Sequence, residues 1–403
     1  MCAARWKFLG IPMVMLAVLL NSTAVRGDDD RDRGDDGNPH DHGDDAPPVQ
    51  IHVPRQASTI QEAIDTVPDG GRVVIHSGTY HESLLIAGKN VELVGRGDAR
   101  IVLPVPLDVV DYSSSLGVVN FRDGGGGSVD RLTLVGGDCG ICAFITDVES
   151  DVSIRNVDIE SSARGMVVVG SVALELSEVS VYDSLWHGIL LVRSPTYRFS
   201  SVAIEDSGGA GFYSIDSLSP DFVCLRLGSG SLNEMSVVGN RRGGIQVFRS
   251  VLCLYESFIG HNYQAGILAQ ESRVTSEFNL ILDTAPNEEG LFGDGMVFGP
   301  GLVGSTATIL ETHIEDSARA AIYNASSTVS LAETTMACSL FDIVLEVAAP
   351  GTWSTEREFL PQTSLPFQMI NGGGVECGCP VADNNCEALP AGDLGPPPPA
   401  DPP

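Results

Sequence analysis

The chain has 403 residues, of which 43% are hydrophobic and 6% aromatic, and it carries 45 glycines and a formal net charge of −30. Binding to nucleic acid or to anionic lipid depends on clustered lysine and arginine, so this charge argues against both kinds of partner. An acidic polysaccharide would also be repelled unless a cation bridged it.

Residues 1–27 are predicted to be a secretory signal peptide. Arg5 and Lys7 precede an apolar run from Phe8 to Leu20, and Ser22-Thr23-Ala24 supplies small residues for cleavage. The run is too short to cross a bilayer, so we expect no membrane span. Export then predicts a secreted protein, extracellular or, in a Gram-negative bacterium, periplasmic.

Residues 28–48 are predicted to be an acidic disordered segment. Nine aspartates lie between Asp28 and Asp45 against two arginines, and nothing apolar is present to order them. His40 and His42 would permit metal binding there, but a solvated tail is the commoner use of such a sequence. We expect neither a metal nor a cofactor in this protein.

The ordered part begins near Val49 with one short helix. Ser58 and Gln61 have the spacing of a capping box, and apolar residues follow at helical spacing until Pro68-Asp69-Gly70-Gly71. Short strand-like runs come next, at Arg72–Ile75, Leu84–Ile86 and Val91–Val94.

Residues 58–97 resemble a known group of proteins. The matching segments are Thr59-Ile60-Gln61-Glu62-Ala63-Ile64, Pro68-Asp69-Gly70, Val73-Val74-Ile75, Gly78-Thr79-Tyr80-His81-Glu82 and Leu93-Val94-Gly95. They resemble the start of pectin methylesterases and, equally, many β-helix proteins of the pectate-lyase-like superfamily. The resemblance implies a right-handed parallel β-helix. The esterases' catalytic Gln-Asp-Thr-Leu and Asp-Phe-Ile-Phe-Gly are absent, and so are the paired aspartates and Arg-Ile-Lys of polygalacturonases. The matching Gly-x-Tyr-x-Glu belongs to the scaffold in that family, so Tyr80 and Glu82 inherit no catalytic role.

A glycine followed by a large apolar residue returns along the chain every 22 to 33 residues, at Gly140, Gly165, Gly188, Gly211, Gly244, Gly266 and Gly295. A period this short, with β-branched runs and polar turns, predicts a solenoid of stacked strands. We therefore predict an all-β fold, a single-stranded right-handed parallel β-helix over residues 49–349, with the short helix plugging its first coil.

Side-chain direction follows from strand alternation. The residue after each glycine should point into the core, and the next should point out: Cys142, Val167, Leu190, Tyr213, Gln246, Leu268 and Val297. Pectate lyases and polygalacturonases carry carboxylates on a comparable outer face, whereas this stripe has none. An apolar stripe on a soluble protein is either covered or used for binding.

Several residues near this stripe are candidate ligand contacts. Trp186 is either a sugar-stacking platform, with His187 and Arg164 as polar contacts, or a shield over the coil edge beside two solvated turn residues. Tyr213 is a further binding candidate because its side chain should point outward.

Two other places on the chain carry charged candidates. Arg241-Arg242 would grip an anionic group or be a solvated turn. Asp294 has the position of a polygalacturonase acid, but a glycosidase needs a second carboxylate, which the sequence does not supply.

Eight cysteines remain after the leader, and an even number in an exported protein predicts disulfides with the pairing left open. They are Cys139, Cys142, Cys224, Cys253, Cys338, Cys377, Cys379 and Cys386. Cys139 and Cys142 have the spacing of a redox pair, but no thioredoxin-like βαβ pattern surrounds them.

Two interruptions of the repeat, Ser217–Cys224 and Thr284–Gly290, should project as loops. Residues 350–389 are predicted to be a cysteine-containing cap that folds back over the last coils and part of the stripe, and residues 390–403 a proline-rich tail. The apolar residues of the cap are Trp353, Phe359, Leu360, Leu365, Phe367, Met369 and Ile370.

Three function classes remain. The favoured one is a secreted, non-catalytic glycan-binding, adhesive or surface module, whose partner would be a polysaccharide or cell-surface glycan. The alternative is a carbohydrate-active enzyme, a polysaccharide lyase or glycoside hydrolase with an atypical site. A pectin esterase is the third. The sequence leaves the substrate and the oligomeric state open.

Overall fold

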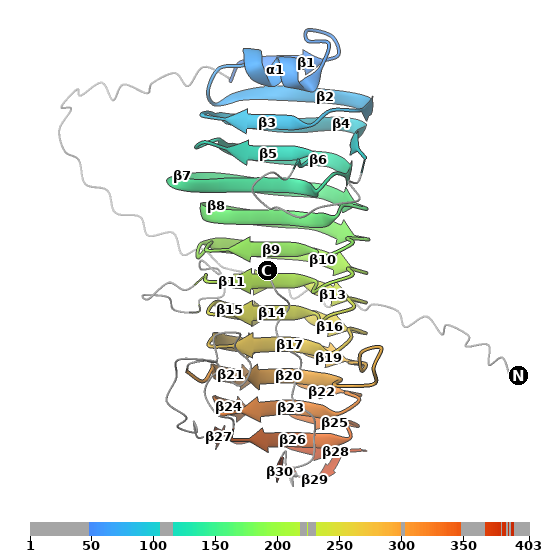
Figure 1. Ribbon diagram of the computed structural model, residues 1–403, viewed down its shortest axis with the longest axis vertical. Coiled ribbons are helices and arrows are strands. Elements are labelled where there is room, and N and C mark those ends of the chain that lie inside the picture. The colour runs from blue at the N-terminus through green and yellow to red at the C-terminus, as the bar shows by residue number, and fades with distance from the viewer. Residues whose placement is uncertain are drawn as a thin grey trace, which may run out of the picture. The chain divides into compact units, whose positions relative to one another are not determined.

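The computed structural model describes residues 48–104, 116–217, 224, 231–299, 303–347, 367–379, 381–383, 386 and 388–390. These residues form a right-handed parallel β-helix, the fold that the repeat and the family resemblance predicted (Figure 1). The predicted signal peptide and nearly all of the predicted acidic segment and proline-rich tail lie outside the described residues. No helix in the described part of the chain is long and apolar enough to cross a bilayer.

Each coil contributes strands to three ladders, within which successive strands pair in parallel. The first ladder contains the repeating glycines. It consists of β3 (Leu84–Ala87), β5 (Val119–Arg122), the first parts of β7 (Cys139–Glu160) and β8 (Arg164–Tyr182), β9 (Ile189–Val192), β11 (Phe212–Ile215), β14 (Ile245–Phe248), β17 (Ala265–Gln270), β20 (Asp294–Gly299), β23 (Ala320–Ala325), β26 (Phe341–Glu346) and β30 (Ala388–Pro390).

The second ladder follows it around the coil. It consists of β1 (Gln50–Val53), the first parts of β2 (Gly71–Tyr80), β4 (Asn90–Leu103), β6 (Gly126–Gly136) and β10 (Tyr197–Glu205), later parts of β7 and β8, then β12 (Ser231–Asn233), β15 (Val251–Tyr255), β18 (Arg273–Glu277), β21 (Thr306–Leu310), β24 (Thr328–Ala332) and β27 (Gln368–Asn371).

The third ladder closes each coil. It begins with the ends of the six long strands and continues through β13 (Ser236–Val238), β16 (Phe258–Gly260), β19 (Leu280–Leu282), β22 (His313–Glu315), β25 (Thr335–Ala337) and β28 (Glu376–Gly378). β29 (Val381–Asp383) pairs with β28 in the antiparallel direction.

The glycine repeat has a packing cause. A Cβ atom on Gly188 would lie 2.3 Å from Ile204 Cγ2 and 2.6 Å from the carbonyl oxygen of Gly211. Gly165 and Gly211 are equally crowded, and the strands that follow the three glycines pair in register in adjacent coils, as predicted. The repeat therefore marks where the first ladder approaches the third too closely for any side chain.

Buried polar side chains stack at the turns between ladders. Asn240 Oδ1 accepts the amide of Ser207 at 3.0 Å, and Asn262 Oδ1 accepts the amide of Asn240 at 3.0 Å. A second column, between the first and second ladders, consists of serines whose hydroxyls each accept the amide of the residue one coil earlier: Ser217, Ser250, Ser272, Ser305 and Ser327. Both columns satisfy turn amides that would otherwise be buried without a partner.

The helix α1 (Ile60–Thr66) caps the first coil, and its Ile60, Ala63 and Ile64 belong to the core. The capping box is shifted by one residue from the predicted one. Thr59 is the N-cap and accepts the amide of Glu62 at 3.1 Å, while the Glu62 carboxylate accepts the amide of Ser58 at 2.8 Å.

Glu82 completes this cap. Its two carboxylate oxygens accept the amides of Ile60 and Gln61, each at 3.0 Å. A carboxylate at a helix N-terminus satisfies amides that have no intrahelical partner. Glu82 therefore has the scaffold role that the resemblance implied.

The described residues of the predicted C-terminal cap add a further coil. β27, β28 and β30 pair in parallel with β24, β25 and β26, and disulfides join Cys338 to Cys379 and Cys377 to Cys386. These strands extend the solenoid and do not lie over the outer stripe. Trp353, Phe359, Leu360 and Leu365 lie outside the described residues.

One of the two predicted loops is described. Between β19 and β20, Asn287 closes a turn by accepting the amide of Gly290 at 2.9 Å, and Glu288, Glu289 and Leu291 are exposed. The other loop lies mostly outside the described residues, but Cys224 forms a disulfide with Cys253 on the outer face of the second ladder.

Candidate functional site

The outer face of the first ladder carries two apolar clusters that are separate from the core. The first contains Cys142, Val167, Leu190 and Tyr213, and the second contains Leu268, Val297, Tyr323 and Val344. The predicted alternation is confirmed, because the residues before these positions, such as Ile189 and Phe212, belong to the core. We call this column of side chains, from Cys142 to Val344, the outer stripe.

An edge of exposed side chains runs beside the outer stripe, at the turns that precede the first-ladder strands. We define it by five exposed residues at equivalent turns of three coils: Leu185, Trp186, Arg241, Arg242 and Tyr263. Trp186 is 49% and Tyr263 is 42% accessible. We call this set the turn edge.

Glycines flatten the turn edge between Trp186 and Arg242. The amide of Gly209 donates to Trp186 O at 2.8 Å, and the amide of Arg242 donates to Gly209 O at 3.2 Å. A Cβ atom on Gly208 would lie 2.2 Å from Leu185 O, so no side chain fits there. The result is an aromatic ring and a guanidinium group separated by one coil of bare backbone.

Arg164 and His187 are buried behind Trp186, at successive positions before the first-ladder glycines. They are therefore not solvated turn residues, whereas Trp186 is half exposed at the coil edge. The His187 ring lies 5.1 Å from the ring of Tyr213, measured between centroids.

His187 is held neutral. Burial, and next the nearby Arg164 guanidinium, lower its pKa to about 4. Its Nδ1 accepts the amide of Ala210 at 3.2 Å, so in the neutral ring the proton is on Nε2. His187 is thus a hydrogen-bond donor whose one basic nitrogen is already occupied.

Tyr213 connects this group to the turn edge. It pairs in register with Leu190 on one side and with Gln246 on the other. The Gln246 amide group donates to the carbonyl oxygen of Arg242 at 2.5 Å. The structure thus brings together, on four adjacent coils, six of the predicted candidates: Arg164, Trp186, His187, Tyr213, Arg241 and Arg242.

Asp294 lies apart from them, on β20, and it has a partner that the sequence did not reveal. The Arg319 guanidinium binds both oxygens of the Asp294 carboxylate, with Nε at 2.8 Å from Oδ1, and the amide of Ala320 donates to Oδ1 at 3.1 Å. Burial raises the pKa of Asp294, and the contact with Arg319 opposes that rise. The partner is a cation and not the second carboxylate that glycoside hydrolysis requires.

Arg319 continues into a buried polar network. Its guanidinium lies 4.8 Å from the centre of the Tyr323 ring, and the Tyr323 hydroxyl donates to Glu346. The network spans β20, β23 and β26 and is surrounded by apolar side chains. Its charged groups are paired with one another, and charged groups are stable in an apolar environment only when they are paired in this way.

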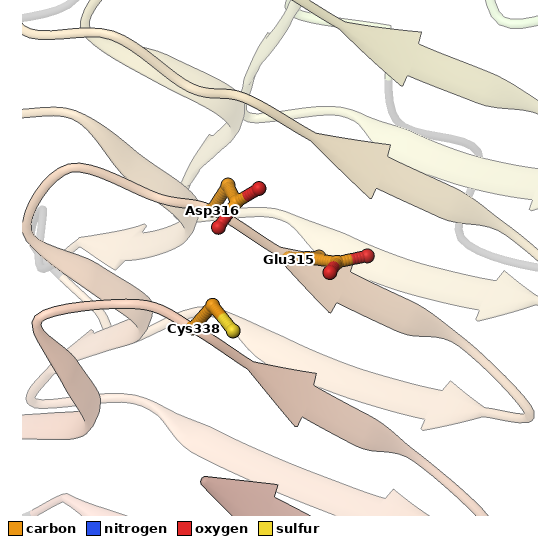
Figure 2. Close-up of side chains that lie close together, drawn as sticks. All are labelled: Glu315, Asp316 and Cys338. Atoms are coloured by element: carbon orange, nitrogen blue, oxygen red, sulfur yellow. The ribbon is translucent and has the colours of Figure 1, made fainter. Parts of the chain in front are cut away.

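Figure 2 shows the one group of metal-ligating side chains within reach of a common point in the described residues: Glu315, Asp316 and Cys338. The Cys338 sulfur is bonded to Cys379 and is not a thiolate, and Glu315 holds His313 at 3.0 Å. Two carboxylates remain, on half-buried Glu315 at the end of β22 and on the exposed Asp316 that follows it. This group does not make a metal centre.

Cys139 and Cys142 form a disulfide on the outer face, and Cys139 pairs in register with Arg164. Both cysteines are buried and lie within one β-strand. The local fold has none of the helix that lowers the pKa of a reactive thiol in a redox pair.

Comparisons with known proteins agree on the fold. No protein-family model matches the sequence, and a comparison with curated proteins finds no match. Among solved structures, the A-module of the mannuronan C-5 epimerase AlgE4 from Azotobacter vinelandii is similar, with a TM-score of 0.56 and 16% identity over 82% of this chain and 94% of that chain. The A-module of AlgE6 from the same organism has a TM-score of 0.53 and 16% identity over 84% of this chain and 94% of that chain.

Proposed function

We propose that this chain is an exported β-helix module that binds a glycan along the turn edge without cleaving it. The observation that carries the proposal is the exposed row of Trp186, Arg241, Arg242 and Tyr263 beside backbone that glycine keeps bare. Planar rings that remain half accessible can stack on the apolar faces of sugars, and guanidinium groups can donate to hydroxyl or acid oxygens.

The spacing of these groups fits an extended chain. Coils are stacked at about 4.8 Å, so Trp186 and Tyr263, three coils apart, are separated by roughly 14 Å. That separation lets several linked sugars lie along the edge at once. Repetition of weak contacts along a polymer is sufficient for binding, because linked sites raise the effective concentration.

The state of the ionisable groups near the edge supports the proposal that the glycan is bound without being cleaved. The basic nitrogen of His187 is occupied by the Ala210 amide, and a general base needs a free one. Asp294, just before a first-ladder glycine, is held by Arg319, and Glu346 on first-ladder strand β26 accepts a hydrogen bond from Tyr323, so each of these carboxylates already has a partner. These observations favour the binding module over a lyase or hydrolase.

Two other observations support export of the protein and a glycan as its partner. All eight cysteines after residue 27 are in disulfides, which persist in oxidising compartments such as the periplasm or the extracellular space. The two similar solved structures come from enzymes named for their action on mannuronan, a polysaccharide. Both points support an exported protein with a glycan partner.

The test is a panel of neutral and acidic polysaccharides offered to the mature protein, read for binding and for products. We expect binding to at least one polymer, and no new reducing ends, unsaturated products or change of sugar configuration after long incubation. Trp186→Ala should abolish most of the binding. Product release by the wild-type chain would reject the non-catalytic part of the proposal, and a chain that binds nothing in the panel would count against the glycan partner.

A further inference from the structure

Basic side chains meet on the outer face of the second ladder, in the first coils beside α1 (Figure 1). His76 on β2 follows the core residue Ile75, so strand alternation points its side chain outward. Arg96 on β4 pairs in register with His76, and its side chain points the same way. His52 on β1 contacts His76 from the other side. Three successive strands therefore present imidazole or guanidinium groups at one place.

The two histidines form a hydrogen-bonded pair. His52 Nδ1 and His76 Nε2 are 3.1 Å apart, and the rings are stacked with their centroids 5.4 Å apart. One of these nitrogens donates and the other accepts. In the neutral pair the remaining ring nitrogens, His52 Nε2 and His76 Nδ1, are therefore one donor and one acceptor. A single added proton would make both of them donors.

Two exposed arginines lie beside this pair. A turn that His52 closes twice fixes the backbone at Arg55, because the carbonyl oxygen of His52 accepts the amide of Gln56 at 2.7 Å and its own amide donates to Gln56 Oε1 at 2.7 Å. Arg96 stands between Gly95 and Gly97, so neither adjacent residue has a side chain that could cover its guanidinium group.

Neither guanidinium group has a carboxylate partner. In the described part of the chain, Arg55 and Arg96 form no ion pair and no side-chain hydrogen bond. The chain has 53 acidic against 23 basic residues, so an arginine on its surface would be expected to meet a carboxylate. Burial and, after it, Arg55, His52 and Arg96 lower the pKa of His76, and no carboxylate is among the groups that shift it. The local charge is thus positive on a strongly negative protein.

The other ionisable groups nearby are engaged or exposed. On β4, Glu92 is held by Arg72 at 2.6 Å, and Asp98 is exposed. The Tyr80 hydroxyl donates to the carbonyl oxygen of His76 at 2.9 Å, and burial raises the pKa of Tyr80, so this group stays neutral. The histidine pair is therefore the group that titrates near neutral pH beside the two arginines.

We propose that Arg55, Arg96 and the pair of His52 and His76 form a binding site for a small oxyanion, such as a phosphate, sulfate or carboxylate group. Guanidinium groups present donors in a planar fork that fits the oxygens of such anions. A bound anion would also favour the added proton that turns both free ring nitrogens into donors, so binding takes up a proton. The site lies away from the turn edge, and the inference does not rest on the glycan proposal.

The test is calorimetric titration of the mature chain, at low ionic strength, with inorganic phosphate, sulfate and acetate in turn. We expect one anion to bind per chain. Binding of any of the three supports the site, and their order of affinity shows whether it takes a tetrahedral anion or a carboxylate. Sulfate has the same charge at pH 6 and pH 8, and it should bind several-fold more tightly at pH 6. Failure of all three to bind would overturn the proposal, and equal affinity for sulfate at the two pH values would overturn the part of the histidines.

Variants show where the anion binds. Arg55→Gln and Arg96→Gln should each weaken binding by about tenfold or more, since each removes charge-assisted hydrogen bonds. His76→Gln should remove most of the pH dependence. Arg155→Gln is the matched control, because Arg155 is also exposed and lies on the same ladder, on β7. An equal loss in the control would show a response to net charge alone and overturn the site.

A titration with zinc tests the competing ligand. Two imidazole nitrogens can hold a metal ion, whereas the two neighbouring guanidinium groups repel a cation. We expect the wild-type chain and His76→Gln to bind zinc equally weakly. Zinc binding that His76→Gln abolishes, in a chain that binds none of the anions, would assign the pair to a metal and overturn the proposal. None of these titrations uses a glycan, so their outcome is independent of the turn edge.

Discussion

The amide of Ala210 donates a hydrogen bond to Nδ1 of His187 at 3.2 Å, across the boundary between two coils. The bond fixes the tautomer of a histidine that is 4% accessible and lies beside the ring of Tyr213. Because Nδ1 is the only basic nitrogen of the neutral ring, His187 can donate a hydrogen bond but cannot take a proton without losing this contact. The packing of two coils therefore determines that His187 can act only as a hydrogen-bond donor beside the outer stripe.

His187 should make the stability of the protein depend on pH. Its pKa falls from 6.5 to about 4 on folding, so between these values the unfolded state binds more protons. This contribution to stability is complete above pH 6.5 and is lost as the pH falls toward 4, about 3 kcal/mol in all. Chemical denaturation at a series of pH values measures it.

The comparison is His187→Gln, which keeps an acceptor for the Ala210 amide but does not titrate. The difference in unfolding free energy between wild type and variant should shift against the wild type as the pH falls from 7 to 4. Parallel curves for the two proteins would show that His187 is as easily protonated in the folded state as in the unfolded one.

Trp186→Ala should weaken glycan binding by about tenfold or more, since truncating a central aromatic contact typically costs about 2 kcal/mol and about 1.4 kcal/mol is tenfold in affinity. The melting temperature should change little because Trp186 is half exposed. Isothermal titration with a polymer from the panel measures the affinity. Phe278→Ala is the matched control, an exposed aromatic residue in the turn that precedes third-ladder strand β19. Equal losses of affinity in both variants would show that the turn edge is not the glycan-binding site.

Arg319→Met should destabilise the protein by roughly 3–5 kcal/mol at neutral pH, because it leaves the Asp294 carboxylate buried without its cation. Adding Asp294→Leu to the same chain should recover much of that loss, since both charges are then gone. Denaturant unfolding of the two variants measures their free energies of unfolding. A double variant as unstable as the single one would show that the pair stabilises the protein through packing and not through its charges.

Asn240→Ala should cost about 1–3 kcal/mol, because it leaves the Ser207 amide buried and without its acceptor. Asn90→Ala, at an exposed asparagine, serves as the control and should cost less than half as much. Thermal unfolding followed by circular dichroism gives both values. Similar losses of stability in the two variants would show that the stacked asparagines do not stabilise the turns.

The disulfide between Cys338 and Cys379 should contribute more to stability than the one between Cys139 and Cys142. Cys338 and Cys379 are separated by 41 residues, so replacing both with alanine removes a constraint of about 2–4 kcal/mol on the unfolded chain. Cys139 and Cys142 are separated by 3 residues, and the same change there relaxes a much smaller loop. Unfolding of the two double variants under oxidising conditions compares them, and a larger loss at Cys139 and Cys142 would contradict this ranking.

The solenoid was predictable because the residues that cause it repeat along the sequence. Each glycine before a large apolar residue marks the same close contact, and Gly165, Gly188 and Gly211 stack as the spacing required. The inward and outward alternation followed from strand geometry alone. The handedness followed from the rule for parallel crossovers. The family resemblance added the scaffold role of Glu82, whose carboxylate caps α1.

The site was less predictable, since its contacts join residues whose spacing has no rule. Arg319 lies 25 residues after Asp294, and only the stacking of β20 on β23 brings them together. The burial of Arg164 and His187 was also missed, because a turn residue before a strand is usually solvated. The serine column gave a signal that was overlooked: Ser250, Ser272, Ser305 and Ser327 return at the coil period.

The measurement that tests the central claim most directly is hydrogen exchange of the wild-type chain with and without a bound polysaccharide, read by mass spectrometry, with the bound polymer recovered and examined for change. We predict protection confined to the peptides that contain residues 185–187, 208–211, 241–246 and 263–266, and a polymer recovered intact. Protection centred on another edge of the solenoid, such as the turn at Phe278, would contradict the account of where the glycan binds. A shortened or chemically altered polymer would contradict the account of what the protein does with it.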